Sequence, residues 1–269
     1  MSILSDQDVI GEVGRNILIY PFKEASLQGD CLALTASDYA YSIEQRKLID
    51  IQTDPVKPKK RFFNIPKSET VLVWTNECVW LSNSFCGSIH SRVRLVSKGI
   101  GHLGTRVNPS WAGILCISLQ NVSNTDVQIT IGEVIAYLRF YRLSSKSLTP
   151  PNLDEPARLD VLPDSCPVPD KLREWIYSEN RWRRGNEDAL RKLLNKSTDY
   201  QEIKKAFQQK SRRYKIELFL KRWAPPLVVA ALILVYLWTS QMNDAVGKLI
   251  LVLIPIAAAI AIETTKNSR

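Results

Sequence analysis

Residues 1–145 alternate short apolar runs with turn-forming residues, a pattern typical of a strand-rich domain. The runs are Asn16–Tyr20, Cys31–Leu34, Thr70–Trp74, Cys86–Ile89, Gly113–Leu119, Val127–Ile131 and Glu133–Tyr141. Many short strands separated in this way predict a mainly β sandwich or barrel. Ser5 can cap a short helix over residues 6–13, because Asp8 then lies in its first turn.

The pattern changes after residue 145. Residues 146–169 are rich in proline and predict an extended linker. From Asp170 onward, apolar residues recur at helical spacing, first at Leu172 and Ile176 and then at Leu190 and Leu194. We therefore expect residues 170–222 to form a neck of two or three amphipathic helices.

Two long apolar runs follow the neck. Ala224–Thr239 holds no charged residue, and at 1.5 Å per residue its 16 residues make roughly 24 Å of helix. Ala245–Ile262 is interrupted only by Lys248 near one end. Residues 223–263 thus predict a transmembrane helical hairpin. A buried core hairpin is the alternative, but neither run has the polar face of an amphipathic helix.

The flanking charges orient this hairpin. Lysines and arginines precede the first span and follow the second, so both termini are expected on the cytoplasmic side of the inner membrane. The first six residues have no basic or long apolar segment, and we expect no signal peptide.

The net charge of +9 is concentrated in the neck. Residues 171–222 hold 16 Lys and Arg against 7 Asp and Glu, which leaves 20 of each sign elsewhere. A basic block before a membrane span can bind anionic lipid headgroups or nucleic acid, or act only as topogenic charge on a solvated face. The residues predicted to make such contacts are Arg181, Arg183, Arg184, Lys204, Lys205, Arg212 and Arg213.

Metal chemistry is not indicated by the sequence. The five cysteines form no Cys-x-x-Cys pair, and the chain has only two histidines. We expect reduced thiols, no metal and no cofactor.

Seven segments occur in an order that resembles the dCTP deaminase and dUTPase superfamily. They are residues 3–10, 28–34, 75–81, 87–100, 106–113, 119–123 and 132–136. The resemblance covers about residues 2–143. It implies a distorted jelly-roll, assembly as a homotrimer, and nucleotide sites between subunits.

The resemblance also locates departures from the catalytic pattern. The family's glycine-arginine-serine-serine-leucine segment, which cradles a triphosphate, is Ser91-Arg92-Val93-Arg94-Leu95 here, and a further family arginine aligns with Ser97. The aspartate of the family's Asp-Pro-Gly-Trp motif aligns with Asn108, and the deaminase glutamate aligns with Ser118. A neutral hydroxyl or amide cannot replace a carboxylate as a proton shuttle, so we expect a catalytically inactive domain.

Binding remains the expected activity of this domain. The predicted nucleotide- and phosphate-binding residues are Arg92, Arg94, Lys98, Arg106 and Asn108, because guanidinium and ammonium groups suit phosphate. A salt bridge between subunits is the alternative role for Arg94. We expect His90 and His102 to be surface or packing residues and Trp111 to be a core anchor.

A nucleotide-binding fold above a membrane hairpin resembles prokaryotic antiphage membrane effectors, such as that of the Hailong system. The leading hypothesis is a homo-oligomeric sensor, a trimer or tetramer, that responds to a nucleotide or short oligonucleotide by opening an ion channel or pore that depolarises the membrane. A partner protein would synthesise the nucleotide. One alternative is a membrane-anchored nucleotide deaminase or diphosphatase with relocated carboxylates at Glu133 or Asp126. Another is a membrane scaffold that recruits a partner through the basic neck.

Overall fold

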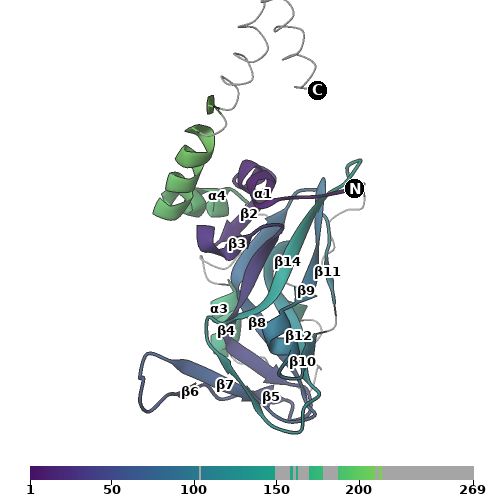
Figure 1. Ribbon diagram of the computed structural model, residues 1–269, viewed down its shortest axis with the longest axis vertical. Helices are drawn as coiled ribbons and strands as arrows, with labels where there is room; N and C mark the ends of the chain where they lie inside the picture. Colours follow the sequence, from purple (N-terminus) through teal and green to yellow (C-terminus); the bar gives the residue numbers. More distant parts are fainter. Residues whose placement is uncertain are drawn as a thin grey trace, which may run out of the picture. The chain divides into compact units, whose positions relative to one another are not determined.

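A computed structural model describes residues 1–102, 104–148, 158–159, 162, 170–177, 187–209 and 212–213. The chain divides into two compact units, Met1–Lys204 and Lys205–Arg269. The first unit contains every strand of the described residues and helices from both ends of its sequence (Figure 1).

Strands dominate the first unit. They are β1 (Ser2–Ile3), β2 (Ile17–Tyr20), β3 (Leu27–Gln28), β4 (Cys31–Ser42), β5 (Lys47–Leu48), β6 (Gln52–Thr53), β7 (Arg61–Ile65), β8 (Thr70–Leu81), β9 (Phe85–Ser91), β10 (Ile100–His102), β11 (Arg106–Val107), β12 (Ala112–Asn121), β13 (Val127–Thr130) and β14 (Val134–Arg142). The helices are α1 (Asp6–Glu12), the 3-10 helix η1 (Glu24–Ser26), α2 (Val93–Val96), α3 (Asp170–Tyr177) and α4 (Glu187–Lys196).

The described strands form two antiparallel sheets. The larger sheet has the order β10-β12-β8-β4-β14-β9-β11, with β1, β2, β3 and β5 paired at its sides. The smaller sheet has the order β13-β7-β6. The curled antiparallel sheet fits the predicted jelly-roll. The prediction of a mainly β N-terminal domain is therefore confirmed.

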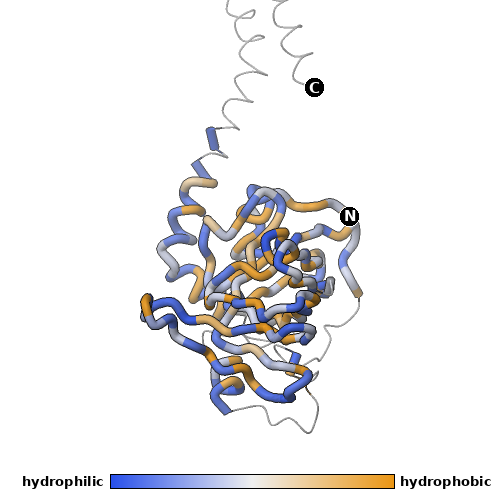
Figure 2. Tube along the Cα trace, turned by 60° about the horizontal axis from the view of Figure 1, so that its bottom comes forward, coloured by the Kyte–Doolittle hydropathy of each residue, from blue (hydrophilic) through white to orange (hydrophobic). Residues whose placement is uncertain are grey.

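The long strand β4 joins the two halves of the larger sheet. Its first residues pair with β14, and its later residues pair with β8, with an irregular register between Ala36 and Ala40. This bend lets one strand serve both halves, which close around a shared apolar core. Trp74, Phe63 and Phe140 in that core are fully buried. Short apolar and polar stretches follow one another along the strands, as Figure 2 shows for the whole described trace.

The predicted opening helix is also present. The Ser5 hydroxyl accepts a hydrogen bond from the Asp8 backbone amide at 3.2 Å, and the Asp8 carboxylate accepts one from the Ser5 amide at 3.1 Å. This reciprocal capping box satisfies two amides at the helix start. The Ser5 hydroxyl also donates to the Asp8 carboxylate at 2.8 Å, and this bond, followed by the one from the Ser5 amide, lowers the pKa of Asp8.

Helices of the neck pack on the strand-rich part of the first unit. Leu172 and Ile176 of α3 and Leu190 and Leu194 of α4 are buried, which confirms the predicted apolar stripes. The α3 helix contacts β4, where the Tyr39 and Trp175 rings lie 4.8 Å apart between centroids. Residues 198–209 are helical as well.

Several sequence-based predictions fall outside the described residues. The hairpin at 223–263 lies outside them, as does most of the proline-rich segment at 146–169. Within the part of the chain that is described, no helix has the length and apolar character needed to cross a membrane.

Candidate nucleotide site

The candidate site is built where β9 ends and α2 begins. Arg92 caps the start of α2, Arg94 lies within this four-residue helix, and Lys98 follows it. The helix is followed by Gly99, whose φ of 82° lies in the left-handed region and does not continue a helix. The Gly99 amide donates to the Val96 carbonyl, and the Gly99 carbonyl accepts the Val122 amide, each at 2.9 Å. Three of the predicted phosphate ligands therefore come from one seven-residue turn.

Arg92 is held inside the protein fold. Its Nη1 lies 3.2 Å from Oε1 of Glu133 and donates to the Val134 carbonyl at 2.9 Å. The two side chains are 21% and 17% exposed, so this ion pair is largely shielded from water. Glu133 also accepts a bond from the Thr130 amide. An anion that binds Arg92 would have to compete with Glu133.

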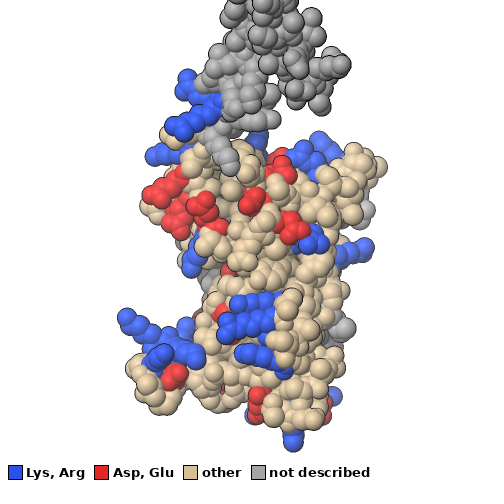
Figure 3. Space-filling model, in the orientation of Figure 1, with Lys and Arg blue, Asp and Glu red and all other residues tan. Residues whose placement is uncertain are grey.

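The other predicted cations face solvent. Arg94 and Lys98 are exposed, and so is Arg106 on the edge strand β11, opposite Ser88 of β9. On the face shown in Figure 3, Lys and Arg side chains gather in the middle of the first unit and again toward the β6–β7 end. None of these three cations forms an ion pair with another described residue. They can therefore attract a phosphorylated ligand without first breaking such a pair.

Asn108 begins a tight turn between β11 and β12. Its carbonyl accepts the Trp111 amide at 3.1 Å, and the side chain is half-buried. Ser110, where the resembling motif has glycine, has a φ of 62° in the left-handed region. Trp111 packs against the core, as predicted, and its ring nitrogen donates to the Gly113 carbonyl at 3.4 Å.

The alternative carboxylates have structural partners. Glu133 is paired with Arg92, and Asp126 accepts the Lys67 amide at 3.0 Å. Ser118 is half-buried in β12, opposite Leu72 of β8. Among the described residues, no group of three His, Cys, Asp or Glu side chains is arranged to hold a metal ion.

Two serine–histidine contacts beside this region were not predicted. The Ser91 hydroxyl lies 2.5 Å from Nδ1 of His102, and the Ser88 hydroxyl lies 2.7 Å from Nε2 of His90 and 2.9 Å from the Tyr141 hydroxyl. Burial lowers the pKa of His102, which favours its neutral form. The alternation of Ser88 and His90 along one strand face was the available signal for the second contact.

A buried acid in β8 was also missed. Glu77 is 5% exposed, and its carboxylate accepts the Thr35 amide at 2.8 Å and the Thr35 hydroxyl at 2.7 Å. Asn76 donates to the Thr35 hydroxyl and to the Ala36 carbonyl. These bonds join β8 to β4 at Thr35 and Ala36, so the cluster stabilises the bend of β4.

The predicted neck contacts are only partly described. The Lys204 ammonium lies 5.5 Å from the centroid of the Tyr200 ring. Lys205, Arg212 and Arg213 are exposed. Arg181, Arg183 and Arg184 lie outside the described residues.

The strand-rich part of the chain is similar to known proteins. The sequence profile described as "dCTP deaminase-like" matches residues 3–143. The dCTP deaminase of Pyrococcus furiosus is 31% identical over 139 residues, which cover 52% of this chain and 84% of that protein. The dCTP deaminase of Pyrococcus horikoshii is 32% identical with the same coverage.

Solved structures match more distantly. The 2'-deoxycytidine 5'-triphosphate deaminase of Agrobacterium tumefaciens superposes with a TM-score of 0.43 and 13% identity, covering 51% of this chain and 47% of that one. The dUTPase of EIAV gives a TM-score of 0.29 at 14% identity, covering 43% of this chain and 97% of that one.

Proposed function

This chain belongs to the dCTP deaminase-like family through residues 3–143, and from this membership we propose that its N-terminal domain binds a nucleotide or short oligonucleotide as a signal. The relatives named dCTP deaminase supply the ligand class, a pyrimidine deoxynucleotide, from which a search for the signal should begin.

The family match over residues 3–143 is the main observation behind the proposed nucleotide binding, and the exposed cations around α2 support it. Arg94 replaces a family hydroxyl with a permanent charge, and Lys98 and Arg106 add two more on exposed positions. Guanidinium groups bind phosphate oxygens in pairs, so this substitution favours phosphate capture. Phosphate capture requires no carboxylate.

We propose that binding occurs without turnover. A hydrolytic deamination needs a group that moves protons between water and the ring. By the motif resemblance, Ser118 and Asn108 align with the family's carboxylates, and neither is a carboxylate. Glu133 and Asp126, the alternative carboxylates, are each engaged in the contacts of a turn or ion pair. A deaminase activity that uses them is the competing proposal, favoured by the names of the relatives.

One experiment separates the two. The full chain, purified gently in detergent, would be analysed by mass spectrometry for released nucleotides and then titrated with dCTP while dUTP formation is followed. We expect bound, unaltered nucleotide and no dUTP above background. Steady dUTP formation that disappears in Glu133→Gln would establish the enzyme instead.

We further propose that ligand binding controls the membrane through the apolar segment at 223–263. The support is the sequence of that segment and the positive charge before it. In this proposal the chain assembles as a homo-oligomer, trimer or tetramer, and acts in antiphage defence by opening an ion-conducting path that depolarises the inner membrane. A second protein that synthesises the nucleotide would supply the signal. Ion flux from liposomes that contain the full chain, with and without the recovered ligand, tests the membrane step, and a passive scaffold predicts no flux.

A further inference from the structure

The helices after residue 187 dock on one corner of the strand-rich part of the first unit. Leu190 and Leu194 of α4, together with Tyr200 and Ile203 of the next helix, are buried. The α4 helix packs against β2, which follows α1 after a short turn. These helices lie beyond residues 3–143, so this docking is an addition to the family domain.

Arg191 makes the first specific contact with the α1–β2 turn, which is residues 13–16. Its Nη1 donates to the Gly14 carbonyl at 3.1 Å, and its Nη2 donates to the Arg15 carbonyl at 3.0 Å. The guanidinium also lies 5.7 Å from the centroid of the Trp80 ring in β8. One charged side chain therefore fastens α4 to two consecutive carbonyls and to the neighbouring strand.

Tyr200 makes the second contact. Its hydroxyl donates to the Val13 carbonyl at 3.1 Å, and its ring meets Phe22 edge-on at 6.1 Å. Gly14 has a φ of +85°, and a Cβ at this position would lie 2.2 Å from the Tyr200 hydroxyl oxygen. Only glycine fits both the backbone and the docked ring, so the turn and the helices are matched surfaces.

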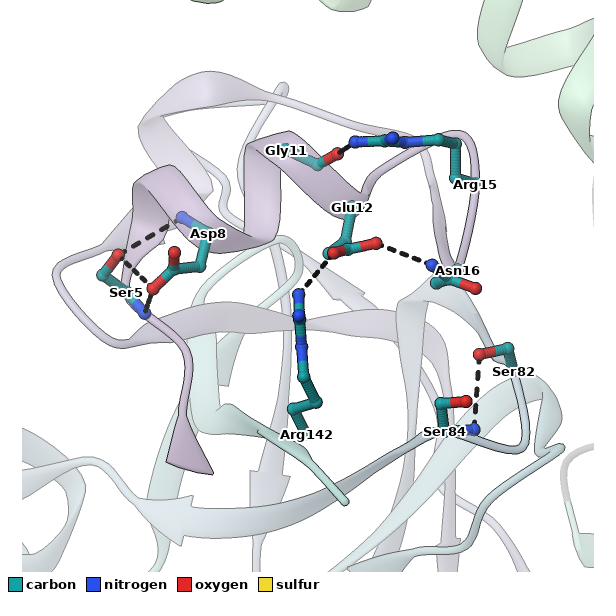
Figure 4. Close-up of polar contacts among 9 residues, drawn as sticks. All are labelled: Ser5, Asp8, Gly11, Glu12, Arg15, Asn16, Ser82, Ser84 and Arg142. Atoms are coloured by element: carbon teal, nitrogen blue, oxygen red, sulfur yellow. Dashed lines mark hydrogen bonds and ion pairs between the residues drawn. The ribbon is translucent and has the colours of Figure 1, made fainter. Parts of the chain in front are cut away.

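The α1–β2 turn is also bonded toward the turn that begins at Asn108. This predicted binding residue lies beside the start of β9, whereas the α2 cations follow the end of that strand. The Asn16 carbonyl accepts the Ser82 amide at 2.9 Å, and the Ser82 carbonyl accepts the Ser110 amide at 3.4 Å. The adjacent Leu81 amide donates to the Trp111 carbonyl at 3.1 Å. Figure 4 shows Asn16 and Ser82 on neighbouring segments of this corner. A continuous set of hydrogen bonds thus joins the docked helices to the turn that begins at Asn108.

The far end of this set is a strained position. Ser110 holds a left-handed φ of 62°, a region that a residue with a Cβ adopts at a cost. Such a residue keeps its conformation only while its surroundings hold it, and the bond to Ser82 is one such restraint. The turn can therefore respond to a change at the α1–β2 corner.

We propose that docking of residues 187–204 on the α1–β2 turn regulates nucleotide binding at Asn108, through Ser82 and the Asn108–Trp111 turn. The docked helices hold this turn in its ligand-competent form, and a bound ligand in return tightens the docking, because coupling between two sites is reciprocal. The proposal rests on nucleotide binding by the family domain. It gives the neck a role besides connecting that domain to the following residues.

Hydrogen exchange of the full chain in detergent tests the coupling without any ligand. Arg191→Ala removes both bonds to the turn, and Lys192→Ala removes an equal charge from an exposed position on the same helix. We expect Arg191→Ala to speed exchange in peptides covering residues 81–82 and 110–111 by about two- to tenfold, the worth of one or two hydrogen bonds. Lys192→Ala should match the wild type.

A dCTP titration of the same proteins tests the regulation. We expect Arg191→Ala to weaken dCTP binding by about fivefold or more, and dCTP to slow exchange over residues 187–204 in the wild type. Faster exchange confined to residues 13–16 and 187–204 in Arg191→Ala would overturn the proposal. If the wild type does not bind dCTP but residues 110–111 still exchange faster in Arg191→Ala, the coupling between the helices and the turn is supported. dCTP is then excluded as the ligand. If Arg191→Ala does not fold, Tyr200→Phe can replace it, because this variant deletes only the hydrogen bond to Val13. We expect it to change hydrogen exchange and dCTP affinity in the same direction, by a smaller factor.

Discussion

At the scale of single residues, Ser110 combines a left-handed backbone with a side chain. Its φ of 62° costs about 1 kcal/mol relative to glycine, because the Cβ approaches the following carbonyl. We predict that Ser110→Gly raises the free energy of unfolding by about 0.5–1 kcal/mol, measured as a higher melting temperature. Ser144→Gly, in an exposed segment without a left-handed φ, serves as the control and should not stabilise. A destabilised Ser110→Gly would mean that the Ser110 side chain makes a contact worth more than the strain.

His102 predicts a dependence of stability on pH. Burial lowers its pKa in the folded state, so the unfolded chain takes up the proton first as the pH falls through about 6.5. The free energy of unfolding should therefore fall between pH 7 and pH 5, and His102→Asn should flatten this part of the curve. Ser91→Ala deletes the hydroxyl beside Nδ1 but keeps the imidazole, so it should retain the slope. Equal slopes in the wild type and His102→Asn, in chemical denaturation at each pH, would exclude this residue as the cause.

At the scale of elements, the ion pair between α2 and the turn before β14 sets how much positive charge the site presents. Glu133 neutralises Arg92 at 3.2 Å and also accepts the Thr130 amide. We predict that Glu133→Gln raises the affinity for inorganic triphosphate severalfold and lowers the melting temperature, because Arg92 gains freedom while a shielded pair is broken. Calorimetric titration measures the first effect and thermal unfolding the second.

Asp126→Asn provides the matched control for this prediction. It also replaces a carboxylate with an amide in a nearby turn, but its partner is the Lys67 amide and not Arg92. We expect lower stability without a gain in triphosphate affinity. A similar gain in both variants would show that overall charge, and not release of Arg92, controls the affinity.

The sequence predicted the long elements better than the short ones for a physical reason. Strands such as β12 and β14 carry apolar runs long enough to stand out between turn-forming residues, and α1 carries a capping box. The two-residue strands β5, β6 and β11 are too short to show any period. The continuation of β4 beyond Leu34 was missed because buried polar residues such as Ser37 occupy its bend.

The candidate site could be predicted only in part for a related reason. The cations around α2 lie within a few residues of each other in sequence, so their grouping was visible. The partner of Arg92 is 41 residues away and reaches it only through the pairing of β9 with β14. Likewise, Arg191 and Gly14 are 177 residues apart, and no local pattern signals their contact.

At the scale of the whole molecule, membrane anchorage is the prediction on which the effector proposal depends. Residues 224–239 lack any charge, and a second apolar run follows at 245–262, so two spans are expected to insert together. The full chain should sediment with membranes and resist both high salt and alkaline carbonate, whereas a chain ending at Arg222 should appear in the soluble fraction. Salt resistance matters because the basic neck alone could bind anionic lipids electrostatically, and salt screens that attraction.

A charge placed inside the first run distinguishes insertion from mere adhesion. Arginine at the centre of a span costs about 2.5–3.5 kcal/mol on insertion scales, so Leu232→Arg should shift part of the chain out of the carbonate-resistant fraction. Gln209→Arg adds the same charge in a helical, exposed position before the hairpin and should leave the fraction unchanged. If carbonate released the full chain as readily as the one ending at Arg222, the apolar runs would have to be buried in protein instead. Ligand binding could then not act by opening a path through the membrane. A scaffold that recruits a partner through the basic neck would become the favoured proposal.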